Sequence, residues 1–581
     1  MCGIAGIIGA GDWLSTVEAM TETLRHRGPD DGGSWSVPGV ALGHRRLAIV
    51  DLSPAGHQPM HFGDYTIVYN GEIYNFRELR RELDGPFHSD SDTEVILHLY
   101  ARYGPACLER LAGMFAFAIW DERKRELFVA RDRLGIKPFF YLQRQGLFAF
   151  ASELKALAGL SSRRVDHTAL WDYFSYKYIP GPKTIYEDVR QLPPAHAMIL
   201  GGEGMRTWRY WSPEPNSEET NPDRAQRRLE ELLHEVVPAH MIADVPIGVF
   251  LSGGIDSTAV VASLDRPKTF AIGFDDPKID EAPYARRVAA HLGTEHHERQ
   301  VPSLEAEEAL TRLPAMFDEP FADLAAWSNY VVSREARRFV TVALSGEGGD
   351  EVFSGYLHHA KSLRYRPSVA ARALSRSLPP FSKLGISALR RASTGVEQHA
   401  ALTGPFNPLQ KRQLLADGLV PPDYDDLWHL RAWWRPELDR IKAMQWLELN
   451  TFLPDDLLVK VDRSSMAVSL EVRPPFLDHR IVEFGLGLAS SVLRDGERGK
   501  LPLRRYLAGK VPDEVLTRRK QGFGMGGGRW LQEHPELTQQ VVSRLARRGI
   551  LGSARMRSFH GTQLWVLHTL DRWLEAAQPT L

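Results

Sequence analysis

The sequence predicts two domains of different fold class and a helical part at the end. An α+β domain of packed sheets comes first, and an α/β domain with a parallel sheet follows it. Strand signals dominate the first part of the chain, and a polar stretch with three prolines at 212–222 interrupts them. Strands then alternate with helices from about residue 245. A chain of 581 residues is also too long for one ordinary core.

Runs of Val, Ile, Phe and Tyr, bounded by Gly, Asp and Pro, predict the strands of the first domain. Helical spacing of apolar residues predicts two helices, over 76–83 and 93–103. This mixture is typical of an α+β unit of packed sheets. The expected strands cover residues 39–51, 65–75, 115–121, 126–132 and 146–153.

Strand–loop–helix alternation predicts the second domain. It is the pattern of a parallel sheet whose strands are joined by crossover helices. Strands are expected at 245–251, 269–274 and 339–344, and helices over 257–264 and 282–292. From about Tyr356 the chain is mostly helical. The expected boundaries are 1–205 for the first domain, 206–222 for a linker, 223–530 for the second domain and 531–581 for a C-terminal helical extension.

The composition excludes several classes of protein. With 43% hydrophobic and 25% charged residues and a formal net charge of -2, the chain has no charge excess that favours nucleic acid or an anionic membrane. Two cysteines, Cys2 and Cys107, cannot form a disulfide framework. No apolar run approaches the ~20 residues of a membrane span, and no secretory signal is recognisable, so we expect a cytoplasmic protein.

The position of Cys2 favours nucleophilic chemistry. Removal of Met1, expected because the second residue is small, would place a thiol and a free α-amine on one residue. An α-amine with a pKa of roughly 7.7–8.0 is partly neutral near pH 7 and can act as a base for the thiol. Taken alone, the position is equally compatible with an inert cysteine.

Four segments after Cys2 carry a resemblance. Together and in this order they are similar to the glutaminase domain of the N-terminal-nucleophile, class II amidotransferases, over roughly the first third of the chain. This resemblance implies stacked antiparallel sheets between helices, with Cys2 as the nucleophile that hydrolyses glutamine. The segments are Arg25 to Asp30, Arg46 to Val50, Asn70 to Asn75 and Ser91 to Glu94.

The same resemblance implies a glutamine site. Arg46 is expected to bind the α-carboxylate of glutamine, and Asp92, assisted by Glu72, its ammonium group. The Asn70 side chain and the Gly71 N–H are expected to stabilise the oxyanion. Each residue also has a structural alternative, since Asn-Gly is a common turn and an Asp before a helix a common N-cap. The implied glutamine-binding residues are Arg46, Leu47, Ala48, Ile49, Val50, Asn70, Gly71, Glu72 and Asp92.

A glycine-rich segment from Leu251 to Ser257 predicts a phosphate site. A buried strand runs into two glycines and then a helix, so backbone N–H groups can face an anion at close range. The segment is not a Walker A loop, because the Gly-Lys-Ser/Thr ending is missing. It resembles the Ser-Gly-Gly-x-Asp-Ser loop of the N-type ATP pyrophosphatases, which release pyrophosphate and leave AMP on the substrate.

This second resemblance implies an ATP site with a Mg2+ ion. Asp256 and Asp350 would hold the ion, which prefers oxygen ligands. Glu347 would act in the acyl-adenylate step, as acid/base or by positioning ammonia, and Lys500 would stabilise the charge on adenylate and pyrophosphate. For Asp455, Asp462 and Asp478, ion pairs at helix ends are as compatible as chemistry. The implied ATP-binding residues are Leu251, Ser252, Gly253, Gly254, Asp256, Ser257, Ile272, Ser345 and Gly346.

The two modules together resemble asparagine synthetases of the glutamine-hydrolysing type, as far as about Gly526. The resemblance implies that ammonia from Cys2 passes through an internal tunnel to a carboxylate activated by Mg-ATP as an acyl-adenylate. With aspartate as acceptor, the products are asparagine, glutamate, AMP and pyrophosphate. It also implies a homodimer, with no nucleic acid and no membrane as partner.

Departures from the family pattern leave the acceptor open. Trp327 stands where a smaller or polar residue is usual, and residues 525–528 also differ from the family pattern. The first alternative is therefore the same chemistry on another carboxylate, of a sugar, a peptide or a natural product. A ring-forming synthetase is a second alternative, but such relatives characteristically lack the N-terminal cysteine. A catalytically silent scaffold or sensing protein is a third, and it would not need both sites.

Overall fold

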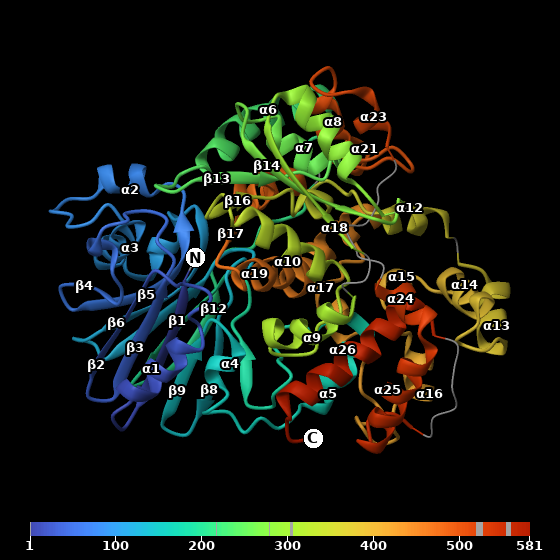
Figure 1. Cartoon of the computed structure of the whole chain (residues 1–581), viewed down its shortest axis with the longest axis horizontal. Helices are drawn as coiled ribbons and strands as arrows, with labels where there is room; N and C mark the ends of the chain where they lie inside the picture. The colour runs from blue at the N-terminus through green and yellow to red at the C-terminus, as the bar shows by residue number, and fades with distance from the viewer. Residues whose placement is uncertain are drawn as a thin grey trace.

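Two antiparallel sheets form the first domain (Figure 1). The computed structural model describes residues 2–216, 218–277, 279–302, 306–365, 367–518, 527–552 and 559–581. One sheet has the strand order β10-β8-β9-β1-β3-β2 and the other β12-β11-β7-β6-β5-β4. The strands are β1 (Gly3–Gly9), β2 (Asp31–Val37), β3 (Val40–Arg46), β4 (Met60–Phe62), β5 (Tyr65–Ile73), β6 (Gly113–Asp121), β7 (Glu126–Arg131), β8 (Phe140–Arg144), β9 (Leu147–Ala151), β10 (Val189–Gln191), β11 (His196–Gly201) and β12 (Gly204–Arg209).

Alternating side chains pack the two sheets together and cover their outer faces. Ile4 and Ala116 belong to a core between the sheets, whereas their neighbours Ala5 and Phe115 belong to separate cores on the outer faces. Because successive strand residues point to opposite faces, the layers are helix, sheet, sheet, helix. This confirms the predicted stack of antiparallel sheets between helices. The helices are α1 (Leu14–Glu22), α2 (Phe76–Glu82), α3 (Asp92–Tyr103), α4 (Leu154–Leu157) and α5 (His167–Tyr176).

A five-stranded parallel sheet forms the centre of the second domain, as predicted. Its order is β15-β14-β13-β16-β17, so the strands that end in the two glycine-rich loops, β13 and β16, lie side by side. Residues 210–221 lead into it from β12, and their described part contains no helix or strand. The strands are β13 (Ile247–Phe250), β14 (Lys268–Phe274), β15 (Glu295–Val301), β16 (Val342–Leu344) and β17 (Glu471–Arg473).

Helices surround this sheet and continue to the end of the chain. One group, in which α7, α8, α10 and α19 contact the strands directly, comprises α6 (Pro222–Ala239), α7 (Ile255–Val261), α8 (Ala282–Leu292), α9 (Ala306–Phe317), α10 (Ala325–Ala336), α11 (Gly349–Val352), α19 (Leu458–Met466), α20 (His479–Gly487), α21 (Ser490–Leu493), α22 (Leu501–Leu507) and α23 (Asp513–Thr517). The others are α12 (Leu357–Arg364), α13 (Val369–Ser377), α14 (Lys383–Ala392), α15 (Gly395–Thr403), α16 (Pro408–Leu414), α17 (Trp428–Trp433), α18 (Arg440–Asn450), α24 (Gly527–Glu533), α25 (Pro535–Arg547) and α26 (Gly561–Ala577).

Helix α26 returns the chain to the first domain. It lies beside α9 and α5 in Figure 1, and the Tyr173 hydroxyl of α5 donates to the Val566 carbonyl at 2.9 Å. Beyond the helix, the Val165 N–H donates to the Thr580 carbonyl at 2.8 Å. None of the helices in the described residues is long and apolar enough to cross a membrane.

Candidate active sites

Cys2 lies at the start of β1, almost enclosed by protein. Its side chain is 8% exposed, and its backbone nitrogen donates to Asn70 Oδ1 at 2.9 Å. Burial raises the pKa of the Cys2 thiol, although the Leu47 backbone and the charge of Arg46 act in the opposite direction. Since a thiol with a raised pKa is a poor nucleophile until it loses its proton, the site needs a base close to sulfur.

The side chain of Asn70 is buried and keeps one donor without a partner in the residues that the structure describes. It sits on β5 with no solvent exposure, and its Nδ2 has no hydrogen-bond partner within the described part of the chain. A buried amide that donates to nothing costs free energy unless a ligand completes it. A side chain at the neighbouring Gly71 would overlap the Met114 carbonyl, so only a glycine fits there. The Asn70 amide therefore leaves a donor beside Cys2.

The loop after β3 is shaped by Arg46. The Arg46 guanidinium donates to the carbonyls of Ser53 at 3.1 Å and Val50 at 3.3 Å, and to that of Asp51. The loop also joins the two domains, since the Asp244 N–H donates to the Ile49 carbonyl at 2.8 Å. Arg46 thus fixes the loop, and a bound carboxylate would share its donors with these carbonyls.

The side chains of the predicted glutamine-binding segment do not all face one site. Leu47 and Ile49 pack in an apolar cluster with Val342 and Met466 of the second domain. The Ala48 N–H donates to Asp30 Oδ2 at 2.9 Å. For Leu47 and Ile49, only the backbone is therefore available to glutamine.

Asp92 and Glu72 already have protein partners. Asp92 Oδ2 accepts from the Tyr69 hydroxyl at 2.7 Å and from the Ile73 N–H at 3.0 Å. Ser91, not Asp92, caps α3, with its hydroxyl accepting from the Thr93 N–H, so the alternative of Asp92 as N-cap is wrong. Burial raises the pKa of the Asp92 carboxyl.

Glu72 connects the first domain to the second. Its Oε2 accepts from Arg473 Nη2 at 2.8 Å, and its Oε1 has no hydrogen-bond partner among the described residues. Burial raises the pKa of Glu72 well above its ordinary value, although Arg473 opposes this. Arg473 lies on β17, so a strand of the parallel sheet reaches the candidate glutamine site.

Arg27 is a site residue whose role the sequence did not reveal. Its Nε donates to the Cys2 carbonyl at 3.1 Å, and its Nη1 donates to Glu153 at 2.7 Å and to Asp462 at 2.8 Å. The side chain has no solvent exposure. Its place within the segment from Arg25 to Asp30 was the only signal in the sequence. Asp462 belongs to α19, so one arginine connects the nucleophile to the second domain.

The first glycine-rich loop closes on itself at the end of β13. Gly253 has a φ of +69°, a conformation that favours glycine. Ser252 Oγ lies 3.2 Å from Ser257 Oγ and accepts from the Gly254 N–H at 3.2 Å. Leu251 and Ile272 are buried, so of these two residues only the backbone can contact ATP.

The second loop, after β16, touches the first. A side chain at Gly346 would lie 2.7 Å from the Ser257 nitrogen, so the absence of a Cβ lets the loops approach. Ser345 follows β16 directly and is buried, whereas Glu347 is half-buried. Burial lowers the pKa of Lys460, but the charges of Glu347 and Asp323 reverse this and raise it, which places Glu347 near α19.

Lys500 brings the two predicted metal ligands together. Its ammonium pairs with Asp256 and, at 2.7 Å, with Asp350 Oδ1. Two carboxylates close enough to share one ammonium are an oxygen donor set that fits Mg2+. Burial lowers the pKa of Lys500, but the two carboxylates outweigh it and raise the pKa above the ordinary value. The Lys500 ammonium therefore remains charged at neutral pH.

A cavity of about 380 Å3 comes near these groups through Tyr356, although neither Lys500 nor the two carboxylates line it. Tyr356 lines it and directly follows Gly355, at which a side chain would overlap both Lys500 and Asp350. Helix α15 supplies the largest share of the wall, and α5, α12, α14, α16, α17 and α18 add single residues or pairs. Trp327 lies on α10, where its side chain is buried, and it does not line this cavity. The prediction that it reshapes an acceptor pocket is therefore not supported. The departure at 525 and 526 lies outside the described residues.

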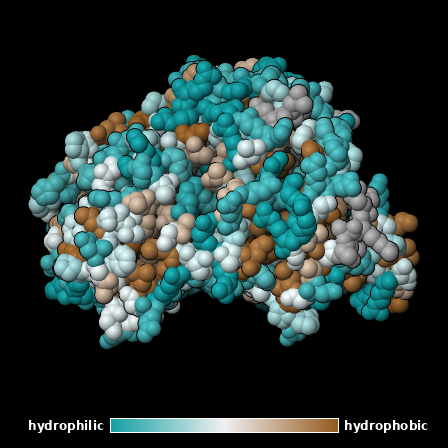
Figure 2. All heavy atoms as spheres, turned by 60° about the horizontal axis from the view of Figure 1, so that its bottom comes forward, coloured by the Kyte–Doolittle hydropathy of each residue, from teal (hydrophilic) through white to brown (hydrophobic). Residues whose placement is uncertain are grey.

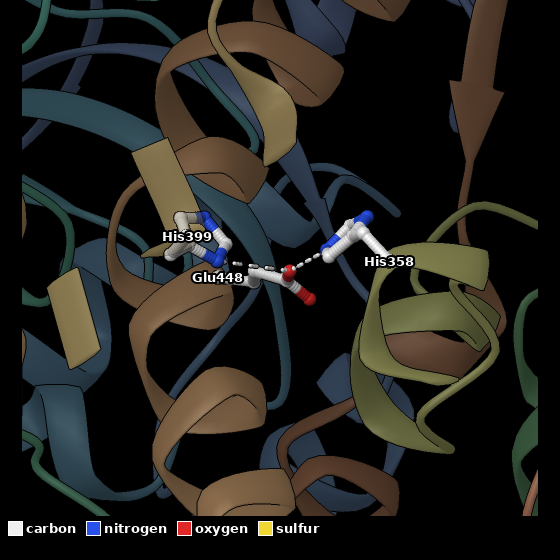
Figure 3. A group of neighbouring side chains, drawn as sticks. All are labelled: His358, His399 and Glu448. Atoms are coloured by element: carbon white, nitrogen blue, oxygen red, sulfur yellow. Dashed lines mark hydrogen bonds and ion pairs between the residues drawn. The ribbon is translucent and has the colours of Figure 1, made fainter. Parts of the chain in front are cut away.

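One wall of the cavity carries a group of titratable side chains. His358 pairs with Glu448 Oε1, and His399 Nδ1 lies 3.9 Å from the same oxygen (Figure 3). Ligand atoms of the three side chains lie within 4.8 Å of one another, a spacing compatible with a metal ion after small shifts. The other oxygen of Glu448 accepts from His359 at 2.9 Å, so the carboxylate is already satisfied by histidines.

The fold and these groups define a class, a glutamine amidotransferase domain joined to a synthetase domain with a parallel sheet. The chain belongs to the asparagine synthase family. The family model "Asparagine synthase" matches residues 228–575, and the model "Glutamine amidotransferase domain" matches residues 1–211.

Curated relatives are similar over most of their length. Asparagine synthetase [glutamine-hydrolyzing] 1 of Bacillus subtilis is 34% identical over 568 residues, which covers 93% of this chain and 90% of the relative. Asparagine synthetase [glutamine-hydrolyzing] 3 of the same organism is 34% identical and covers 98% of this chain and 92% of the relative. A relative called amidase chry2, from Gibberella zeae, is 28% identical and covers 90% of this chain and 88% of the relative.

Proposed function

We propose that the protein is a glutamine-hydrolysing asparagine synthetase whose substrates are glutamine, Mg-ATP and aspartate. In the first half-reaction, the α-amine of Cys2 takes the thiol proton and the thiolate attacks the glutamine amide. Asn70 Nδ2 and the Gly71 N–H stabilise the oxyanion, and ammonia leaves as the thioester forms. Water then releases glutamate. The unpartnered Asn70 amide beside Cys2 is the observation that carries this assignment.

The second half-reaction takes place at the paired loops of the parallel sheet. The acceptor carboxylate attacks the α-phosphorus of ATP, giving an acyl-adenylate and pyrophosphate, and ammonia displaces AMP to form the amide. Asp256 and Asp350 would hold Mg2+, and the bound ion would neutralise charge on the phosphates. Lys500 lies between these carboxylates, where its ammonium can move to the pyrophosphate oxygens. Glu347, at the turn of the second loop, would orient ammonia.

The names of the Bacillus relatives favour aspartate as the acceptor. A larger carboxylate, on a sugar, a peptide or a natural product, is the second candidate. The cavity favours it, because about 380 Å3 next to Tyr356 exceeds what an amino acid of aspartate's size fills. The amidase name of a more distant relative is compatible with this second candidate.

One experiment separates the candidates. AMP and pyrophosphate are measured with glutamine and Mg-ATP, with and without aspartate, and products are identified by mass spectrometry. Aspartate-dependent AMP with equimolar asparagine supports the first candidate. Glutamate formation without aspartate-dependent AMP would contradict aspartate as acceptor and leave the larger carboxylate. If neither glutamate nor AMP forms with any acceptor tested, both candidate functions are wrong, and the protein is a catalytically silent scaffold.

A further inference from the structure

Helices α13 and α14 form a hairpin at the periphery of the molecule. They pack against each other, and Figure 1 places them at the right-hand edge, on the side away from the first domain. Helix α13 buries none of its residues. Only Gly385 and Ala388 of α14 are buried. The hairpin therefore contributes little to the core, and its composition needs another explanation.

Large apolar side chains of the hairpin face solvent. Val369 is 84% exposed, Leu384 69% and Leu374 49%. Hydrophobic residues also gather at the right-hand edge of Figure 2, the side on which Figure 1 places α13 and α14. Several exposed apolar side chains on two adjacent helices are more than the isolated cases common on protein surfaces, and they mark a surface that another body covers.

The charges of the hairpin all have one sign. Residues 367–396 contain five basic residues and no Asp or Glu. Within the part of the chain that the structure describes, none of the five forms an ion pair; Arg390 donates instead to the Ala401 carbonyl at 2.9 Å. The formal net charge of -2 for the whole chain conceals this local excess. The five are Arg372, Arg376, Lys383, Arg390 and Arg391.

We propose that the α13–α14 hairpin docks the protein onto an anionic membrane surface. Amphipathic helices with basic polar faces lie in the plane of the interface, with apolar side chains in the acyl boundary and cations among the headgroups. Arginine and lysine favour this arrangement because their long stems remain in apolar surroundings while the charge reaches the phosphates. The overall charge balance predicted no membrane partner, but docking depends on the local surface.

Two other occupants are less compatible with this surface. A nucleic acid would use the cations but would gain little from Val369 and Leu384. A second copy of the hairpin would cover the apolar side chains but would bring five more positive charges against the first five. A lipid surface with anionic headgroups satisfies both the charge and the apolar area.

Vesicle flotation tests the proposal with the full-length protein. Wild type is mixed with phosphatidylcholine vesicles with and without phosphatidylglycerol, at low and at high salt. The double variant Val369→Asp with Leu384→Asp should lose at least about tenfold in partition onto the anionic vesicles. The pair Arg372→Gln with Arg376→Gln should lose roughly 25-fold at low salt and little at high salt, since each cation near the surface contributes about fivefold.

Matched variants outside the hairpin serve as controls. Met205→Asp replaces another exposed apolar residue, on β12, and Arg227→Gln with Arg228→Gln removes two exposed cations of α6. Both should bind vesicles as wild type does. No flotation of wild type with anionic vesicles would overturn the proposal, as would equal losses in hairpin and control variants. A concentration-dependent dimer that the hairpin variants abolish, or binding to nucleic acid in preference to vesicles, would overturn it as well.

Discussion

At the residue scale, the environment of Cys2 disfavours ionisation of its thiol, and the Asn70 amide beside it has, among the described residues, a free donor that can bind a negative charge. Burial raises the pKa of the thiol, and the nearby backbone nitrogen of the same residue is held by Asn70 Oδ1. Once Met1 is removed, that nitrogen is an amine whose lone pair can take the thiol proton. In the proposed mechanism the same Asn70 side chain offers Nδ2 to the oxyanion, so one amide would both position the base and stabilise the charge.

Replacing Cys2 separates the two proposed half-reactions. Cys2→Ala should abolish glutamine-dependent synthesis, while ammonia-dependent synthesis stays within about twofold because that step needs no thiol. Both are measured as AMP and amide formed, with glutamine or with ammonium chloride as nitrogen source. If both disappear in a protein that still unfolds cooperatively, the two-site scheme is wrong.

Asn70→Ala tests the oxyanion assignment. Loss of one donor to a developing oxyanion lowers kcat by about 100- to 1,000-fold, so glutamine hydrolysis should fall by that factor with a smaller change in KM. Steady-state glutamate release gives both constants. Asn221→Ala removes an asparagine that caps α6 and should leave hydrolysis unchanged. A purely structural Asn70 would instead lower the unfolding temperature without a selective loss of kcat.

The sequence predicts which residues carry the reacting groups of the proposed reaction, but it predicts little about the residues that orient them. Cys2 and Asn70 follow from the chemistry of glutamine hydrolysis and from ordered motifs. Arg27 could not be assigned a role, because its partners Glu153 and Asp462 are remote in sequence. Asp92 and Glu72 show the same limit, since their bonds to Tyr69 and Arg473 depend on packing that no local pattern reveals.

At the element scale, α19 connects the candidate sites. It presents Asp462 to Arg27, which holds the Cys2 carbonyl, and Lys460 lies in the field of Glu347. A shift of α19 on nucleotide binding would therefore move the contact with Arg27 in the first domain as well as Lys460 near Glu347. Removing the charge of Asp462 should leave Arg27 with one carboxylate partner fewer, and Arg27 should then hold the Cys2 carbonyl less firmly.

Asp462→Asn tests this connection. We expect glutamine-dependent synthesis to fall by about tenfold or more, and ammonia-dependent synthesis to fall less, because a buried charge loses its partner on the glutaminase side. Asp478→Asn is the matched control, since Asp478 pairs with Arg480 inside the second domain. Equal losses with glutamine and with ammonia would show that Asp462 acts only on stability.

Elements with strong local patterns could be predicted, and those defined by packing could not. The helix expected over 282–292 is α8, with the same bounds, and the strand expected over 269–274 is β14. Strand β1 lacks the expected composition because Gly6 must leave room for the Phe150 ring. Strand β17 has three residues, and two of them, Glu471 and Arg473, are charged and buried. Charged residues in a sequence predict an exposed position, so this strand was not expected.

At the scale of the whole molecule, buried neutral histidines make stability depend on pH. Burial lowers the pKa of His568 to about 4, so the folded state stays unprotonated while the unfolded state binds a proton below about 6.5. The stability contributed by keeping this histidine neutral is therefore lost as pH falls from about 6.5 toward 4, by up to about 1.4 kcal/mol per pH unit.

The variant His568→Gln isolates this share. Glutamine can still bond to Thr538, which lies 3.2 Å from His568 Nε2, but it does not titrate. Wild type should lose more stability than the variant between pH 7 and pH 5, measured as urea midpoints. A difference between the two proteins that stays constant over this range would contradict the neutral, buried state of His568.

The buried ionic contacts between the domains also constrain how this chain can diverge. Arg27 of the first domain pairs with Asp462 of the second as well as with Glu153 of its own, and Arg473 of the second domain pairs with Glu72 of the first. Replacing one member of such a pair leaves the other as an unpaired buried charge. This lowers the free energy of unfolding far more than replacing both members together. Substitutions at these positions should therefore be tolerated only when both partners change together. A chimera that exchanges one domain with that of a relative should have mismatched charges at the domain interface, even when each domain folds on its own.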